Sequence, residues 1–378
     1  MKFMGTTVIG LEDVAAREVE EILGVQAETG VGRVFFECSE EAVFKINLWS
    51  RCLNRLFILL CSSEAENLDD VYKLTYDIDY SKFILPSQSF AVRGKRYGEH
   101  SFTSMDLAAK VGQAIIDSYK SSTGVRLKVD LDNPDVEFYC FVRRERLYLG
   151  INTSGESLHK RNYRLYQHPA SLKATIAAPL IRVSNWKHKE VFLDPMCGGG
   201  TIVIEAALIA RNIAPGLFRR EFALTRLYFI DLEEFLKEKE KAAEALNRGE
   251  YEIYGSDISE KHVKGAAWNA ESADVLDTIK FLVCDSRRIH DKVNIAPDVV
   301  VTNPPYGIRS GRIKIVKKLY LETLLSLREA SKNVRVVAIT GAVKEFEEAV
   351  KEAGYTMLEE RLVHHGALPT KAYVCTPK

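Results

Sequence analysis

The sequence predicts an α/β protein whose C-terminal half forms a mostly parallel sheet and whose N-terminal half forms smaller α+β units. In the C-terminal half, short apolar runs alternate with helix-length segments, a pattern typical of parallel α/β sheets. A glycine cluster follows the first of these runs, as at strand-to-helix turns that approach a ligand. A chain of 378 residues also exceeds one ordinary core, so we expect two or three domains.

The composition is that of a globular protein, with 46% hydrophobic and 28% charged residues. The formal net charge is zero, so a nucleic-acid-binding surface would have to be a local basic patch. No apolar run approaches the roughly 20 residues that span a bilayer, and the N-terminus is too polar for a signal peptide. The 7 cysteines are scattered without a C-x-x-C pair, which favours reduced thiols over disulfides or zinc. We therefore expect a cytoplasmic protein without a membrane contact.

The N-terminal half predicts two α+β units followed by a polar linker. The first unit has expected strands at 6–10, 33–38 and 55–63 and expected helices at 12–23 and 40–49. The second has expected helices at 68–78 and 104–119 and expected strands at 89–96, 125–131, 136–143 and 146–154. We place the domains at 1–65 and 66–156, the linker at 157–168 and the C-terminal domain at 169–378.

The C-terminal domain predicts five strands with intervening helices, followed by an antiparallel tail. The expected strands are 190–196, 251–257, 281–285, 299–303 and 334–340. Helices are expected at 200–214, at the polar insertion 233–250, and at 259–273 with Ser259 as N-cap. The tail predicts two antiparallel strands at the sheet edge, 355–365 and 371–377.

The glycine cluster Asp194-Pro-Met-Cys-Gly-Gly-Gly-Thr201 lies at the first strand-to-helix junction. Glycines allow the backbone to turn tightly and to approach a ligand closely. The third position of a dinucleotide fingerprint is Val203, and a P-loop lysine is absent, which weakens both the NAD and the ATP interpretation. For this stretch alone, a tight turn without a ligand remains the alternative.

Two carboxylates follow the next two strands, Asp257 after YGS and Asp285 after LVC. Ligands of open α/β sheets bind beyond the carboxyl ends of the strands, so these side chains are candidates for one site. A carboxylate can accept both ribose hydroxyls of an adenosine, and a second one can accept the exocyclic amine of adenine. Either acid alone is more often a helix cap or a turn residue.

The fourth strand ends in Asn303-Pro304-Pro305-Tyr306. Prolines cannot donate to a sheet ladder and they fix the backbone, so the strand must stop there. The Asn303 side-chain oxygen and the Pro304 carbonyl can act as preorganised acceptors for the N–H groups of a planar amine. Tyr306 can stack on a target base, a contact worth about 1–3 kcal/mol. The alternative is a rigid loop that packs Tyr306 into a core.

The ordered motifs DPMCGGGT, GSDIS, CDSRRI and TNPPYGIR resemble those of class I S-adenosylmethionine-dependent amino-methyltransferases, over about residues 163–378. The resemblance implies a Rossmann-like domain with an antiparallel C-terminal strand and S-adenosyl-L-methionine as cofactor. The implied cofactor contacts are Asp194, Met196, Cys197, Gly198, Gly200 and Thr201 at the methionine half, Asp257 and Ile258 at the ribose, Asp285 and Ser286 at adenine, Asn303 at the methyl group, and Leu172 on an approach helix.

Three positions in these motifs carry qualifications. Met196 stands where the family often has an aromatic residue, and Gly199 where it often has serine. Cys197 lies inside the glycine turn, so we interpret it as a packed residue rather than as a nucleophile on a pyrimidine carbon. Catalytic roles are implied for Asn303, Pro304 and Tyr306, and the residues predict no metal-ligand cluster.

The stretch NPDVEFYCFVRRERLYLGINTSGESLHKRNYR resembles the end of an RNA-binding THUMP domain, which a ferredoxin-like domain precedes. The three domains together resemble THUMP-containing tRNA (guanine-N2)-methyltransferases. This implies methylation of a guanosine N2 amine in a tRNA acceptor stem, at position 6, with tRNA as the partner and no obligatory protein partner. The alternatives are an enzyme of the same layout acting on ribosomal RNA, an adenine-N6 DNA or protein-glutamine methyltransferase, and a non-catalytic RNA-binding protein.

Basic residues are grouped at three places and are candidate RNA contacts. They are Arg93, Lys95 and Arg96; Lys160, Arg161 and Arg164; and Arg309, Arg312 and Lys314. Together they can form a track that leads phosphates into the site, whereas each group alone is often only a solvated face. We expect His159 and His168 to be hydrogen-bonded structural residues.

Overall fold

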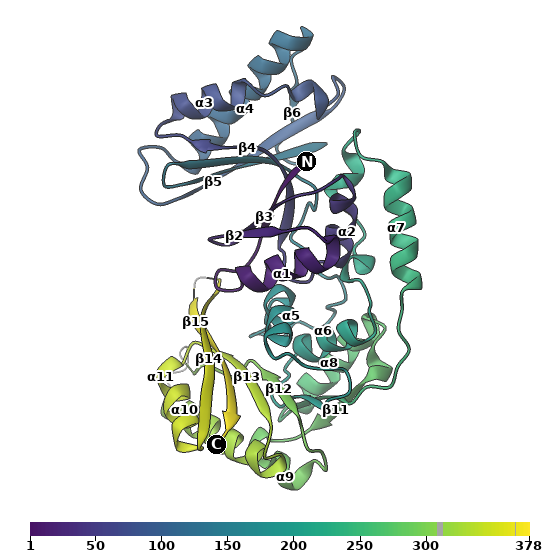
Figure 1. Ribbon diagram of the computed structural model, residues 1–378, viewed down its shortest axis with the longest axis vertical. Coiled ribbons are helices and arrows are strands. Elements are labelled where there is room, and N and C mark those ends of the chain that lie inside the picture. The colour runs from purple at the N-terminus through teal and green to yellow at the C-terminus, as the bar shows by residue number, and fades with distance from the viewer. Residues whose placement is uncertain (308–312, 367) are drawn as a thin grey trace.

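Two β-sheets organise the chain in a computed structural model that describes residues 1–307, 313–366 and 368–378 (Figure 1). The N-terminal sheet has eight strands and the C-terminal sheet has seven in the described part of the chain. Within the same ranges, the structure contains no helix with the length and apolarity to cross a bilayer.

The N-terminal sheet has the strand order β2-β3-β1-β4-β8-β7-β5-β6. Its strands are β1 (Lys2–Thr6), β2 (Ala27–Gly30), β3 (Arg33–Glu37), β4 (Arg55–Glu64), β5 (Ser89–Tyr97), β6 (Lys128–Val129), β7 (Val136–Arg143) and β8 (Arg146–Asn152). Its helices are α1 (Glu12–Leu23), α2 (Glu41–Trp49), α3 (Leu68–Tyr76) and α4 (Ser104–Thr123), with the short η1 (Tyr80–Lys82).

Most predicted elements of this half are confirmed, but the first strand is wrong. It covers Lys2–Thr6 rather than 6–10, because the chain turns after Thr6 and reaches a left-handed Gly10 with φ of 95°. The turn is held by the Thr7 hydroxyl, which donates to the Cys52 carbonyl at 2.9 Å. Strand β2 was not predicted, since AETG has neither alternation nor β-branched residues beyond one threonine.

Strand β4 belongs to both predicted N-terminal units. It pairs with β1 on one side and with β8 on the other, both antiparallel. The two units therefore share one continuous sheet, although the sequence boundary between them falls at the end of this strand.

The N-terminal sheet is strongly curved. Phe35 of β3 stacks on Tyr148 of β8 with ring centroids 5.5 Å apart, although β1 and β4 lie between these strands. Three strand spacings of about 4.8 Å would separate them in a flat sheet, far beyond contact. The cluster on this face consists of strand residues alone, and in Figure 1 α3 and α4 lie above β4 and β5 while α1 lies below β2. We call this concave surface the helix-free face.

The C-terminal sheet has the strand order β11-β10-β9-β12-β13-β15-β14. Its strands are β9 (Phe192–Asp194), β10 (Ile253–Asp257), β11 (Ile279–Val283), β12 (Val299–Thr302), β13 (Arg335–Thr340), β14 (Tyr355–His365) and β15 (Leu368–Pro377). Its helices are α5 (Ala174–Val183), α6 (Thr201–Ala210), α7 (Leu232–Glu244), α8 (Glu260–Ser272), α9 (Ile289–Lys292), α10 (Ile313–Ala330) and α11 (Val343–Glu352). Short 3-10 turns are η2 (Pro215–Phe218), η3 (Ala223–Arg226), η4 (Leu276–Thr278) and η5 (Ser286–Arg288).

This domain is the predicted mostly parallel, Rossmann-like sheet. The pairs from β11 through β13 are parallel, and β15 and β14 are antiparallel at the edge. One face packs against α5, α6 and α8, and the other against α10 and α11. Both the parallel core and the antiparallel tail were predicted and are confirmed.

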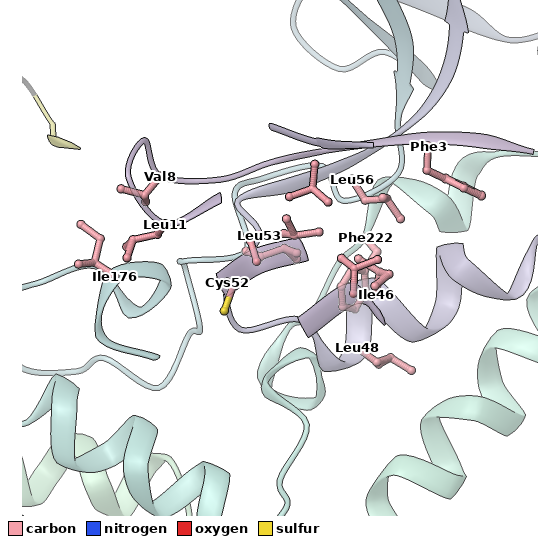
Figure 2. Close-up of a cluster of buried hydrophobic side chains, with 14 of the residues drawn as sticks. Phe3, Val8, Leu11, Ile46, Leu48, Cys52, Leu53, Leu56, Ile176 and Phe222 are labelled. Atoms are coloured by element: carbon pink, nitrogen blue, oxygen red, sulfur yellow. The ribbon is translucent and has the colours of Figure 1, made fainter. Parts of the chain in front are cut away.

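A hydrophobic cluster joins the ferredoxin-like unit to the C-terminal domain (Figure 2). In this cluster Val8 and Leu11 lie beside Ile176 of α5, and Ile46 of α2 lies beside Phe222. All five side chains are at most 7% exposed. The two parts are thus held by a shared core rather than by a solvated linker.

An ion pair is buried next to this cluster. Glu205 of α6 is 0% exposed, and it accepts hydrogen bonds from Arg161 Nε at 3.2 Å and from the Tyr163 hydroxyl at 3.1 Å. Arg161 also donates to the Arg51 carbonyl at 3.0 Å. Arg51 in turn donates to the carbonyls of Leu208 and Ile213 at 3.2 and 2.7 Å. The linker, the ferredoxin-like unit and α6 therefore meet at one hydrogen-bonded point.

Replacing Glu205 by glutamine should destabilise the fold strongly. The substitution keeps the shape but leaves the buried Arg161 charge unpaired, which costs about 3–5 kcal/mol of unfolding free energy. Urea denaturation of the full chain measures this. Glu156→Gln is the matched control, because Glu156 pairs with Lys160 on the surface and should cost less than about 1 kcal/mol. Equal losses for the two variants would contradict a structural role for the buried pair.

Candidate active site

The carboxyl ends of three neighbouring strands bring the predicted site residues to one edge. Strand β9 pairs in parallel with β10 on one side and with β12 on the other, so the strand order reverses there. This is the switch point at which open α/β sheets bind ligands. Asp194 ends β9, Asp257 ends β10, and Asn303 follows β12 directly.

Asp194 ties two of these strands together. Its Oδ1 accepts hydrogen bonds from the Thr302 hydroxyl of β12 at 2.9 Å and from the Met196 N–H at 3.2 Å. The side chain is only 1% exposed. Burial raises the pKa of this carboxyl to about 7, despite these two hydrogen bonds, which favour the ionised form.

The glycine turn has the backbone that its composition predicts. Gly198 and Gly200 are left-handed, with φ of 53° and 80°, and α6 begins directly afterwards at Thr201. A side chain on Gly200 would place its Cβ 3.0 Å from the Ala266 Cβ and would be strained at this φ, so the position favours glycine. Cys197 is buried in the turn and burial raises the pKa of its thiol, which suits a packed residue and not a nucleophile.

Asp257 lies across from the glycine turn. It accepts hydrogen bonds from the Gly198 N–H at 3.0 Å and from the Ser259 N–H at 2.9 Å, and His262 Nδ1 lies 3.3 Å from Oδ1. The neighbouring Ile258 is 67% exposed, unusual for an isoleucine at a strand end. A carboxylate beside an exposed apolar side chain and a tight glycine turn fits the ribose and the base of an adenosine.

The two predicted adenine contacts, Asp285 and Ser286, have hydrogen-bond partners within the protein. Arg287 donates to both oxygens of Asp285, with Nη2 2.5 Å from Oδ2, and this pairing lowers the pKa of the carboxyl. The Ser286 hydroxyl is buried against the Thr323 hydroxyl at 2.8 Å. Both residues follow β11, but the Ser286 side chain faces the core of the domain and the Asp285 carboxylate is paired with the Arg287 guanidinium.

The Asn-Pro-Pro-Tyr segment closes on itself. The Tyr306 hydroxyl donates to Asn303 Oδ1 at 2.7 Å, so the predicted amine acceptor already holds a donor. Pro304 is buried and Pro305 exposed, and the Pro305 carbonyl accepts from the Tyr320 hydroxyl of α10 at 2.8 Å. Tyr320 also lies 2.9 Å from the Thr340 hydroxyl. Sequence reasoning missed this support, because Tyr320 occupies an ordinary apolar position of its helix.

The end of the linker covers the glycine turn. Asn269 of α8 accepts from the Tyr166 N–H at 2.7 Å and donates to the Gly199 carbonyl at 2.9 Å. The His168 ring packs edge-on against the His262 ring, with centroids 4.4 Å apart. Asn269 and His262 were not singled out from the sequence, since a polar residue within a helix carries no signal of such contacts.

Arg161 is wrong as an RNA contact, and Arg164 has partners within the protein. Arg161 is 4% exposed, and its guanidinium forms a buried ion pair with Glu205. Arg164 donates to the Leu172 carbonyl and to the Thr201 hydroxyl, each at 3.0 Å. Both guanidiniums therefore belong to the domain junction. The buried Leu172 contributes its carbonyl to this junction.

The remaining basic residues are placed as follows. Lys95, Arg96 and Lys160 are exposed, the last in a surface pair with Glu156. Arg93 pairs with Glu137 at 2.8 Å. Arg309 and Arg312 lie outside the described residues, and Lys314 lies in α10 with a side chain outside the described part.

His159 is a hydrogen-bonded structural residue, as expected. Its ring is bonded to the Ser157 hydroxyl at 2.7 Å, and burial lowers its pKa to about 4. Over the described ranges, no group of three or more His, Cys, Asp and Glu residues is placed to hold a metal ion.

Comparison with known proteins agrees with this geometry. Residues 161–371 match the model of the RMKL-like methyltransferase domain, residues 65–152 the THUMP domain, and residues 2–57 the RlmL ferredoxin-like domain. The sheet with its switch-point site is thus that of a class I S-adenosylmethionine-dependent methyltransferase. Within that class, the chain belongs to the RMKL-like methyltransferase family and carries ferredoxin-like and THUMP domains.

Relatives align over the whole chain. A tRNA (guanine(6)-N2)-methyltransferase of Methanocaldococcus jannaschii is 43% identical, with 100% of both chains covered. One of Archaeoglobus fulgidus is 41% identical over 99% of this chain and 92% of its own. The solved structure of SMU.472, a putative methyltransferase complexed with SAH, has a TM-score of 0.88 at 26% identity, covering 100% of this chain and 98% of that one.

Asp194 should make stability depend on pH. Between its ordinary unfolded value near 4 and about 7, the folded protein keeps a proton that the unfolded chain has lost. The contribution of this group to the free energy of unfolding is therefore present at low pH and lost as pH rises to 7. From pH 5 to pH 8, the wild type should lose about 3 kcal/mol relative to Asp194→Asn.

Urea denaturation of both proteins at the two pH values gives this difference, and the other titrating groups cancel between them. A difference that stays constant with pH would mean that Asp194 ionises normally.

Proposed function

We propose that this methyltransferase modifies the N2 amine of a guanosine in tRNA, at position 6 of the acceptor stem. One observation carries the proposal: Asn303 follows β12 at the switch point, ahead of two prolines, and Tyr320 holds the carbonyl of the second proline, Pro305. Support for the substrate comes from two relatives of 43% and 41% identity that are named for this reaction.

The residues of the site suit the cofactor in position and chemistry. The glycine turn from Asp194 to Thr201 would hold the methionine half, and Asp257 and Ile258 would hold the ribose and the base. When bound, S-adenosylmethionine supplies a methyl group on a sulfonium, which is an activated leaving group. The chain therefore needs no covalent nucleophile.

The Asn-Pro-Pro-Tyr segment would act on the amine. The lone pair of an exocyclic amine is delocalised into the base, so the nitrogen is a poor nucleophile. The Asn303 oxygen and the Pro304 carbonyl would accept its two N–H groups, favour a pyramidal nitrogen and aim the lone pair. The prolines keep both acceptors fixed, so little ordering remains to be done during the reaction.

Tyr306 would change partner when the base arrives. Its hydroxyl donates to the same Asn303 oxygen that the amine would use, and we propose that the arriving amine takes this place. The released ring is then free to stack on the base. A guanine within a duplex must first be flipped out, which costs a few kcal/mol.

We assign RNA binding to the domains at 1–65 and 66–156, which the linker at 157–168 joins to the catalytic domain at 169–378. We also assign the enzyme and its tRNA to the cytoplasm.

The substrate assignment predicts a specific product. The full chain, incubated with unmodified tRNA and labelled S-adenosylmethionine, should yield N2-methylguanosine, identified by mass spectrometry of the digested nucleosides. Modified guanosine should be absent after incubation with DNA. Product formed only on ribosomal RNA or DNA, or as N6-methyladenosine, would overturn the proposal.

Substitution of Asn303 should lower turnover, whereas substitution of Asp257 should weaken cofactor binding. Asn303→Ala should lower kcat at least about 100-fold with nearly unchanged cofactor affinity, because it removes a preorganised acceptor for the amine. Asp257→Asn should weaken cofactor binding, measured by calorimetry, with the tRNA affinity retained.

Tyr306→Phe is the matched control for Asn303→Ala, since it removes the same hydrogen bond but keeps the acceptor and the ring. It should retain most of the turnover. A collapse of cofactor binding in Asn303→Ala, or an equal loss of kcat in Tyr306→Phe, would contradict the assigned role.

A further inference from the structure

A basic cavity opens on the helix-free face, away from the methyl-transfer site. It has a volume of about 300 Å³ and lies between β3 and the hairpin formed by β7 and β8. We call it the arginine pocket. The residues that line it are Gly30, Val31, Arg33, Phe35, Arg143, Arg144, Arg146 and Tyr148. The ferredoxin-like and THUMP domains both contribute to its wall.

Arg33 is the buried centre of the arginine pocket. Its side chain spans the curved face, so that the guanidinium carbon lies 5.1 Å from the ring centroids of both Phe141 and Tyr148. The residue is only 5% exposed, and Nη1 donates to the Val31 carbonyl at 3.2 Å. Its Nε is buried without a hydrogen-bond partner. Such an unsatisfied charged donor costs free energy and indicates a missing acceptor.

The pocket holds an excess of positive charge. Among the described residues, none of its four arginines forms a salt bridge, and Arg146 donates only to the neutral Ser62 hydroxyl at 3.2 Å. Burial, and in smaller part the charge of Arg143, lowers the pKa of Arg33. By contrast, Arg93 on the next part of this sheet is paired with Glu137. Four cations without a salt-bridge partner favour an anionic occupant.

The surroundings favour a nucleic-acid strand over a free anion or an acidic peptide. Tyr97 is 44% exposed and lies 5.9 Å from the guanidinium carbons of both Arg33 and Arg143. The exposed Lys95 and Arg96 precede it on β5. Aromatic rings interleaved with cations bind single strands, because bases stack on the rings while phosphates meet the cations. Guanidinium forks also match phosphate oxygens in geometry.

We propose that the arginine pocket binds a backbone phosphate of a single-stranded segment of the RNA substrate, with a neighbouring base stacked on Tyr97 or Tyr148. The identity of that RNA rests on the proposed function. The binding surface is then built jointly by β3 of the ferredoxin-like domain and the β7–β8 hairpin of the THUMP domain.

The test uses the full chain and the two exposed arginines of the pocket, since Arg33 is too buried for a clean substitution. Arg144→Gln/Arg146→Gln is compared with Lys120→Gln/Arg126→Gln, which removes two exposed charges of the same domain that do not line the pocket. Binding of a labelled ten-nucleotide oligocytidine is measured by fluorescence anisotropy between 50 and 200 mM salt.

The pocket variant should bind the oligonucleotide at least tenfold more weakly than the wild type at 50 mM salt. Its plot of log affinity against log salt should be shallower by about 0.7, the value for one lost phosphate contact on a single strand. The control variant should bind like the wild type. Equal binding by the two variants would overturn the proposal.

Competitors identify the occupant. Inorganic phosphate and poly-glutamate are titrated against the labelled oligonucleotide, and both should compete at least tenfold less well than unlabelled oligocytidine. Phosphate that competes as well as the oligonucleotide would make this a free-anion site. Poly-glutamate that does so would indicate an acidic protein partner. Either result would overturn the proposal.

Methylation kinetics keep this proposal separate from the proposed function. The pocket variant should raise the KM for tRNA with kcat unchanged. A wild type that binds oligocytidine through the pocket but does not methylate tRNA would refute the function and leave the pocket standing. A pocket variant with wild-type binding and KM would refute the pocket alone.

Discussion

The buried carboxylate of Glu205 is the constraint on which the arrangement of the molecule depends. It lies on α6, the helix that begins at the glycine turn, and it holds Arg161 and Tyr163 of the linker. Through Arg161 it also reaches the backbone of Arg51 in the ferredoxin-like domain. One desolvated charge pair thereby fixes the glycine turn, the linker and the ferredoxin-like domain relative to one another. Loss of one partner costs more free energy than the intact pair contributes, because it leaves the other charge buried and uncompensated.

The sequence predicted the candidate site best where its polar residues directly follow the ends of strands. The glycine turn, Asp257 and Asn303 each follow an apolar run, and parallel strands necessarily bring their carboxyl ends to one edge. The fold class could therefore be predicted together with the location of the candidate site. The shifted first strand was missed because KFMGT and TTVIG have similar β-propensity, and the left-handed Gly10 decides between them.

The partners of polar side chains were the part that could not be predicted. Arg161 lies in a basic run that resembles a solvated patch, but its carboxylate partner is 44 positions away and meets it only in the folded chain. In the same way, Asp285 was placed correctly after its strand, yet the nearby Arg287 takes both of its oxygens. Local pattern indicates where a polar group lies, whereas pairing depends on contacts between distant segments.

Strand β4 limits where the N-terminal half can be divided into separate domains. It gives one edge to the ferredoxin-like strands and the other to the THUMP strands, with a register irregularity between Leu59 and Cys61. Exchange of the THUMP domain alone would leave this strand with unpaired backbone groups unless the newcomer reproduced the same register. The eight-stranded sheet is therefore one structural unit, and a family boundary drawn along the sequence need not be a place where the molecule can be divided.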